Sequence, residues 1–173
     1  MKRMRPLAWG MLAVWASWIT AVQAVAVSKT FLGRWTPDLS LLLVVGCAAR
    51  LHKRDVVFAA LVIGLARTAY SVDAPEALLA GYLASAALVR SVRRTADLEA
   101  PVLLLALGLL LELGLASWLV LVHALRTGAD AGESLGAALP GMLAGAATTA
   151  LCALLAGGFV FLPGLTPLRT RRW

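Results

Sequence analysis

Charged residues are scarce in this chain of 173 residues. They make up 14% of the sequence, against about 25% in ordinary soluble proteins, whereas 61% of the residues are hydrophobic and the mean hydropathy is +0.84. A soluble domain of this size keeps much of its surface in water and could not cover so much apolar area. The composition therefore predicts an integral membrane protein that forms a single transmembrane domain over residues 1–173.

The side chains that build metal and catalytic sites are equally few. Cys47 and Cys152 lie inside apolar segments, and His52 and His123 are far apart in the sequence. None of the four has a second ligand at metal spacing, and the sequence contains no nucleophile elbow, P-loop or Gly-rich dinucleotide turn. We therefore expect no catalytic residues, no metal, no cofactor and no enzyme activity.

Six apolar segments approach or exceed the length that crosses a bilayer, which is about 20 residues for a helix. Three of them begin near a proline, at Pro37, Pro75 or Pro101, and proline suits the first turn of a helix because its missing N–H is not needed there. The expected fold class is all-α, a compact bundle of six transmembrane helices. The predicted spans cover residues 6–27, 37–50, 56–72, 75–89, 101–125 and 135–162.

Lysine and arginine are concentrated in the segments that six crossings would place on one side of the membrane. Twelve of the 16 basic residues fall near the two chain ends and in the turns after the second and fourth spans. The positive-inside rule places these segments in the cytoplasm. We therefore predict a multi-pass protein of the bacterial inner membrane with both termini cytoplasmic. The net charge of +7 then reflects topology, and no nucleic acid is expected as a partner.

The N-terminal segment also has features of a cleavable signal peptide. Basic residues at positions 2–5 precede an apolar run that ends in Val22-Gln23-Ala24. The run is long for a signal peptide and contains three bulky tryptophans, and its removal would leave five spans. We expect the segment to stay as the first span, with a mature start at Val25 as the alternative.

Small side chains spaced four residues apart predict where membrane helices approach closely. The last span has the clearest such stripe, through Gly141, Gly145 and Thr149, and we expect this helix to be central. The fourth span has a shorter version at Gly81. The fifth span is bulky nearly all round, and we expect it to face lipid except on the side that carries Glu112.

Two ionisable residues, Arg67 and Glu112, lie well inside predicted spans. A charge in lipid is costly, so each needs a partner or water. The two could pair, although their expected depths differ by about 10 Å at a helical rise of about 1.5 Å per residue. Alternatively, Arg67 extends to the outer interface while Glu112 is protonated or bonded to a neighbour. A role in transport or proton transfer is a third alternative.

The second span is short, and it begins with residues typical of a helix N-terminus. Thr36 or Asp38 can accept hydrogen bonds from the first N–H groups, and an acid suits the positive end of the helix dipole. Fourteen residues cover about 21 Å, which is less than the hydrocarbon thickness. We expect either that other helices cover this segment or that the bilayer thins around it.

Residues 37–45 (PDLSLLLVV), with the basic turn that begins at Arg50, resemble the rod shape-determining protein MreD family. The fourth span with Gly81-Tyr82 and its basic exit, and the ending Leu162-Pro163-Gly164-Leu165, resemble the same family. The length and the number of spans also match. The family usually carries an acidic residue shortly after the position of Gly64-Leu65, where this chain has Arg67 instead.

The resemblance implies a non-catalytic scaffold of the cell-elongation machinery that makes peptidoglycan. Such a scaffold binds an MreC-like single-span protein and is linked to a RodA-type glycosyltransferase, a penicillin-binding transpeptidase and MreB. The implied fold is that of the S-component of energy-coupling-factor transporters, so a vitamin-binding S-component is the alternative function. In that alternative, Ala13, Ser17 and Ala21 of the first span would meet the coupling subunit. The residues expected at partner or helix-packing positions are Pro37, Asp38, Arg67, Gly81, Tyr82, Glu112, Gly141, Gly145 and Thr149.

Overall fold

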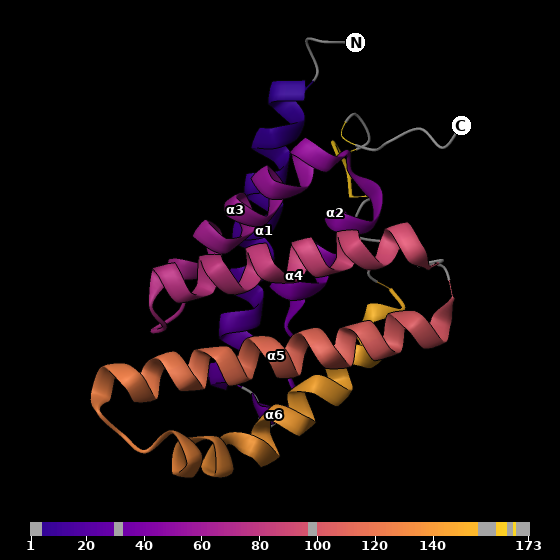
Figure 1. The fold of residues 1–173 in the computed structure, drawn as a ribbon. Coiled ribbons are helices and arrows are strands. Elements are labelled where there is room, and N and C mark those ends of the chain that lie inside the picture. Colours follow the sequence, from indigo (N-terminus) through magenta and orange to yellow (C-terminus); the bar gives the residue numbers. More distant parts are fainter. Residues whose placement is uncertain (1–4, 30–32, 97–99, 156–161, 166–167, 169–173) are drawn as a thin grey trace.

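The computed structural model describes residues 5–29, 33–96, 100–155, 162–165 and 168. The regular structure of these residues is α-helical, with one short 3-10 helix (Figure 1), so the predicted all-α class is confirmed. In chain order the elements are α1 (Arg5–Lys29), η2 (Gly33–Trp35), α2 (Leu39–Arg50), α3 (Lys53–Thr68), α4 (Pro75–Thr95), α5 (Pro101–Thr127) and α6 (Ala131–Ala153).

Three helices, α1, α5 and α6, are long and apolar enough to cross a membrane. The fourth strongly apolar helix, α2, has only 12 residues. The other two helices carry more charge: α3 begins with Lys53-Arg54-Asp55, and α4 has Glu76 in its first turn and arginines in its last turn. The described part of the chain therefore contains apolar helices suited to a membrane protein. Three of its helices are long and apolar, α2 is short, and α3 and α4 have charged ends.

Several helix ends lie where local signals place them. Pro75 opens α4 and Pro101 opens α5, as predicted, because the first helical position needs no N–H. Gly128 has φ 72° and ends α5 in the left-handed conformation that glycine adopts without strain. Asp130 caps α6 by accepting a 2.8 Å hydrogen bond from the Glu133 N–H, so this helix begins before the predicted Leu135.

Other predicted boundaries differ from the helix ends by about one to two and a half turns. The third span was expected to reach Val72, but α3 ends at Thr68 and is followed by turns. The fourth was expected to end at Val89, but α4 continues to Thr95, where its arginines suit the negative end of the helix dipole. The last span was expected to reach Leu162, but α6 ends at Ala153, and residues 156–161 lie outside the described part of the chain.

The short helix α2 lies at the centre of the molecule. All of its residues from Ser40 to Ala48 are buried, and each of the other five α-helices contacts it. The prediction that the sixth helix would be central is therefore wrong. α6 packs mainly on α5 and exposes large side chains such as Leu143 and Leu151. Twelve residues rise only about 18 Å, so longer helices can enclose α2 on all sides.

The other helices are arranged around α2 in two groups (Figure 1). α5 and α6 form an antiparallel pair, with α4 lying beside α5. α3 packs between α1 and α4, and α1 runs across the direction of α4 and α5. α5 buries Leu107, Gly108, Leu111 and Leu115 on one side and exposes large apolar side chains on others, which agrees with the predicted lipid-facing helix.

Candidate functional site: a buried polar cluster at the start of α2

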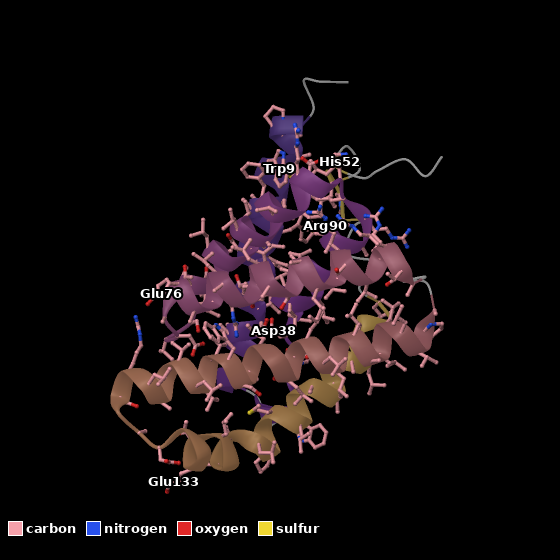
Figure 2. The ribbon with its side chains drawn as sticks, in the orientation of Figure 1. Trp9, Asp38, His52, Glu76, Arg90 and Glu133 are labelled. Atoms are coloured by element: carbon pink, nitrogen blue, oxygen red, sulfur yellow. The ribbon has the colours of Figure 1, made fainter. Side chains whose placement is uncertain are left out.

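Asp38 is the N-cap of α2, and this buried carboxylate is the centre of the candidate site. Its Oδ1 accepts a 2.9 Å hydrogen bond from the Leu41 N–H, which confirms the predicted capping role. Pro37 is half-buried and precedes the cap, so the helix begins at Leu39 rather than at the predicted Pro37. Figure 2 shows Asp38 in the middle of the molecule, away from both charged ends.

Two residues from distant helices bond to Asp38. The Tyr82 hydroxyl of α4 donates to Asp38 Oδ2 at 3.3 Å, and the Asp38 N–H donates to the Thr149 hydroxyl of α6 at 2.9 Å. Tyr82 and Thr149 are fully buried. The structure therefore brings together three of the residues that the sequence singled out, from α4, α6 and the start of α2. A buried polar group without a partner is costly, so each bond favours this one helix arrangement.

Gln23 of α1 is a second cap for α2 that the sequence analysis missed. Its Oε1 accepts from the Leu39 N–H at 3.1 Å, and the N–H and hydroxyl of Ser40 each lie 3.4 Å from it. Gln23 is 3% exposed, although the sequence placed it within a signal-peptidase-like motif. A single amide in an otherwise apolar helix was the available signal. Cleavage before Val25 would remove this side chain and leave N–H groups at the start of α2 without acceptors.

Arg67 and Glu112 complete the cluster without forming an ion pair. Arg67 Nε and Glu112 Oε2 are buried and have no hydrogen-bond partner in the described structure. The charges of Arg67 and Asp38 nevertheless lie close enough to act on Glu112, whose carboxyl also interacts with Thr149. The structure therefore contradicts the alternative in which Arg67 and Glu112 form an ion pair. It gives Glu112 a neighbour in Thr149, as the second alternative allowed.

Hydrogen bonds bring polar side chains of α1, α4 and α6 onto the start of α2, and Glu112 of α5 is a neighbour of Thr149. Asp38 uses both carboxylate oxygens and its N–H, so it joins its own helix to α4 and α6. Such a network holds helices in one register, because any shift leaves buried donors and acceptors unpaired. In the residues that the structure describes, no three His, Cys, Asp or Glu side chains form a group that could hold a metal.

The predicted glycine and small-residue positions have mixed outcomes. Gly81 is buried against Leu115 and Trp118 of α5, and Gly145 is buried within α6. Gly141 faces open space, since a Cβ added there would meet nothing within 4 Å, so no described helix of this chain packs against it. α5 and α6 instead come close together at Gly108, where an added Cβ would lie 3.0 Å from Ala150 Cα.

Two grooves lie on the outside of the helices, each of about 440 Å³. One lies between α4 and α5, where the Trp118 Nε1–H donates to the Ala77 carbonyl at 2.9 Å. The other lies beside α1 and is lined by the predicted stripe Ala13, Ser17 and Ala21, together with Trp18 and Tyr70. Both are lined mainly by small and apolar side chains.

Comparisons with protein-family models, curated proteins and solved structures find no match to this chain.

Proposed function

We propose that this protein is a non-catalytic scaffold of the bacterial inner membrane, belonging to the machinery that elongates rod-shaped cells. In this proposal it crosses the membrane six times, binds an MreC-like single-span protein, and links that protein to a RodA-type glycosyltransferase, a penicillin-binding transpeptidase and MreB. The observation that carries the proposal is the place of the Pro37-Asp38 segment. The residues that resemble the MreD family form the central helix and its cap, around which the other helices pack.

The distribution of charge over the structure supports the six-span placement. Figure 2 shows His52 and Arg90 on the same side of the molecule as Trp9, with Glu76 and Glu133 on the opposite side. Arg93 of α4 donates to the Leu51 carbonyl at 3.0 Å, which brings two basic segments together at one end. At the other end, Arg126 pairs with Glu76. One strongly basic end and one mixed end are what the positive-inside rule requires.

The use of the polar residues favours a scaffold over a ligand-binding protein. The polar side chains of the cluster are already hydrogen-bonded to one another or to the start of α2. They are those of Asp38, Tyr82, Gln23 and Thr149. The grooves lie on the outer faces and are lined by small side chains, the kind of surface on which membrane helices pack. Such a molecule is suited to holding other membrane proteins in a defined arrangement.

A second candidate function is the S-component of an energy-coupling-factor vitamin transporter. The groove beside α1 favours it, because Ala13, Ser17 and Ala21 line a concave surface of the kind a coupling subunit would need. Ser17→Leu would fill this groove. Gly10→Leu is the matched control on the same helix, because a Cβ at Gly10 meets nothing within 4 Å.

Purification of the tagged full-length protein from its own membranes in mild detergent separates the two functions. If the protein is the scaffold, a single-span protein with a large extracytoplasmic part should co-purify with it. Rod-shaped cells depleted of this protein should become round. The scaffold would be contradicted if the protein were recovered with a coupling subunit and its ATPases and retained a vitamin. In that case Ser17→Leu should lose the coupling subunit and the vitamin, and Gly10→Leu should keep them.

A further inference from the structure

Two contacts fix the register of the antiparallel helices α3 and α4. A Cβ added to Gly64 would lie 2.8 Å from Leu79 Cδ2 and 3.4 Å from Tyr82 Cδ2, so this part of α3 is level with Leu79–Tyr82 of α4. Toward the other end, Arg93 Nη1 lies 3.0 Å from the Leu51 carbonyl oxygen. Both helices rise by about 1.5 Å per residue, so Arg54 of α3 lies level with Arg90 of α4.

Arg90 and Arg94 lie on the side of α4 that turns toward α3. Arg90 follows Leu79, which contacts α3, by three helical turns, and Arg94 is one turn further along. Arg54 and Arg94 are exposed and Arg90 is half-buried. The three side chains therefore gather over the seam where α3 and α4 meet, which we call the α3–α4 seam.

No carboxylate in the described residues pairs with any of these three arginines. Asp55 is the acid in the first turn of α3, and it has an interaction of its own. Asp97 and Glu99 follow α4 in a segment outside the described residues. Cations held at one level without an acid between them repel one another, and an anion between them removes this cost.

Apolar side chains lie directly below the arginines along the α3–α4 seam. Val57 of α3 is 45% exposed, Ala87 of α4 is exposed at about the same level, and Leu61 is half-buried one turn further along. Phe58, one turn from Arg54, is 61% exposed and packs edge-on against Trp9 of α1 at 6.2 Å between ring centroids. A cationic rim above an apolar wall matches a molecule with an anionic head and a hydrocarbon chain, and a free phosphate would leave the wall unused.

We propose that Arg54, Arg90 and Arg94 bind the phosphate of an anionic phospholipid whose acyl chain lies along the α3–α4 seam. The guanidinium groups donate charge-assisted hydrogen bonds to the phosphate oxygens. The inference rests on the proposed membrane placement, with this end of the molecule at the cytoplasmic headgroups, where anionic lipids attract basic residues. It does not depend on the scaffold role.

Native mass spectrometry of the purified full-length protein tests this site. Wild type is compared with the double variant Arg54→Gln/Arg90→Gln, and with Arg126→Gln, which removes an exposed arginine at the opposite end. Each protein is titrated with phosphatidylglycerol, with phosphatidylcholine of the same chains, and with glycerol 3-phosphate. We expect wild type and Arg126→Gln to retain one phosphatidylglycerol preferentially, and the double variant to bind it about 25-fold more weakly, at about fivefold for each arginine.

Three results would overturn the site. The first is equal retention of phosphatidylglycerol by the double variant and wild type, and the second is equal retention of phosphatidylcholine and phosphatidylglycerol by wild type. The third is saturation by glycerol 3-phosphate at the same concentration as the lipid, which would indicate a soluble anion site. Resistance of the protein to carbonate extraction is measured on the same membranes, so failure of the lipid site is distinguished from failure of the membrane placement.

Discussion

The Asp38 N–H donates a 2.9 Å hydrogen bond to the Thr149 hydroxyl, and this bond joins the start of the central helix to α6 across 111 residues of sequence. Both residues are buried, so neither group can turn to water instead. The bond gives Thr149 a role that its place in a stripe of small residues did not suggest. It acts as an acceptor for the backbone and as a neighbour of Glu112, as well as a small packing residue.

Removal of this hydroxyl tests the bond. Thr149→Val keeps the shape of the side chain but leaves the Asp38 N–H unpaired, so we expect the free energy of unfolding to fall by about 1–3 kcal/mol. Thr148→Val is the matched control, because the Thr148 hydroxyl bonds only to carbonyls of its own helix and should cost about 0.5 kcal/mol or less. Denaturant unfolding in detergent gives both values, and equal losses would contradict the assignment.

The bond between Tyr82 and Asp38 should appear as a coupling between the two positions. Tyr82→Phe removes one hydrogen bond and is expected to cost about 0.5–1.5 kcal/mol. In an Asp38→Ala background the same change should cost less, because the hydroxyl has already lost its acceptor there. Tyr70→Phe, at a half-exposed tyrosine at the end of α3, is the control and should be additive with Asp38→Ala. Additivity at Tyr82 as well would mean that the two side chains do not bond.

Arg67 and Glu112 should be coupled through their charges although no ion pair joins them. Arg67→Met removes a buried cation that acts on Glu112, and Glu112→Gln removes the carboxyl on which it acts, so the double variant is expected to be more stable than the sum of the two losses predicts, by about 0.5–3 kcal/mol. The same cycle at Arg126 and Glu76, whose side chains are mostly exposed, should give about 1 kcal/mol or less. A smaller coupling at the buried positions than at the exposed pair would contradict the cluster.

Gly108 and Gly114 lie on the same helix but should respond oppositely to alanine. A Cβ at Gly108 would lie 2.8 Å from Ala153 Cβ and 3.0 Å from Ala150 Cα, so Gly108→Ala forces α5 and α6 apart and should cost about 1–3 kcal/mol. A Cβ at Gly114 meets nothing within 4 Å, and Gly114→Ala should stabilise the helix by up to about 1 kcal/mol. Thermal unfolding of the two variants measures the difference, and a change of the same sign in both would contradict the α5–α6 contact.

Local features of the cluster could be predicted from the sequence, because they depend on neighbouring residues alone. Asp38 follows a proline and precedes an apolar run, which is enough to predict a cap, and Pro101 and Gly128 mark the two ends of α5 in the same way. The partners of Asp38 could not be predicted. Gln23, Tyr82 and Thr149 reach it only through the packing of separate helices.

The position of each helix could not be predicted from its hydropathy, for a physical reason. α2 and α5 are both apolar nearly all round, yet α2 is buried and α5 exposes Leu110 and Leu125. Lipid chains and a protein interior are equally apolar, so one sequence pattern suits both surroundings. Helix length was the useful signal, because a helix as short as α2 does not span the hydrocarbon core by itself and can be covered by its longer neighbours.

The most direct test of the proposed six-span membrane placement is the accessibility of single cysteines to an impermeant maleimide, in a background with Cys47 and Cys152 replaced by serine. Trp35, Val72 and Ala129 lie between helices at the end proposed to be extracytoplasmic, and His52 and Ala96 lie between helices at the other end. With six spans placed in this way, we predict that cysteines at the first three positions are labelled in intact cells. Cysteines at the other two positions should react only after the membrane is permeabilised. Labelling of His52→Cys in intact cells, or protection of Val72→Cys, would contradict it.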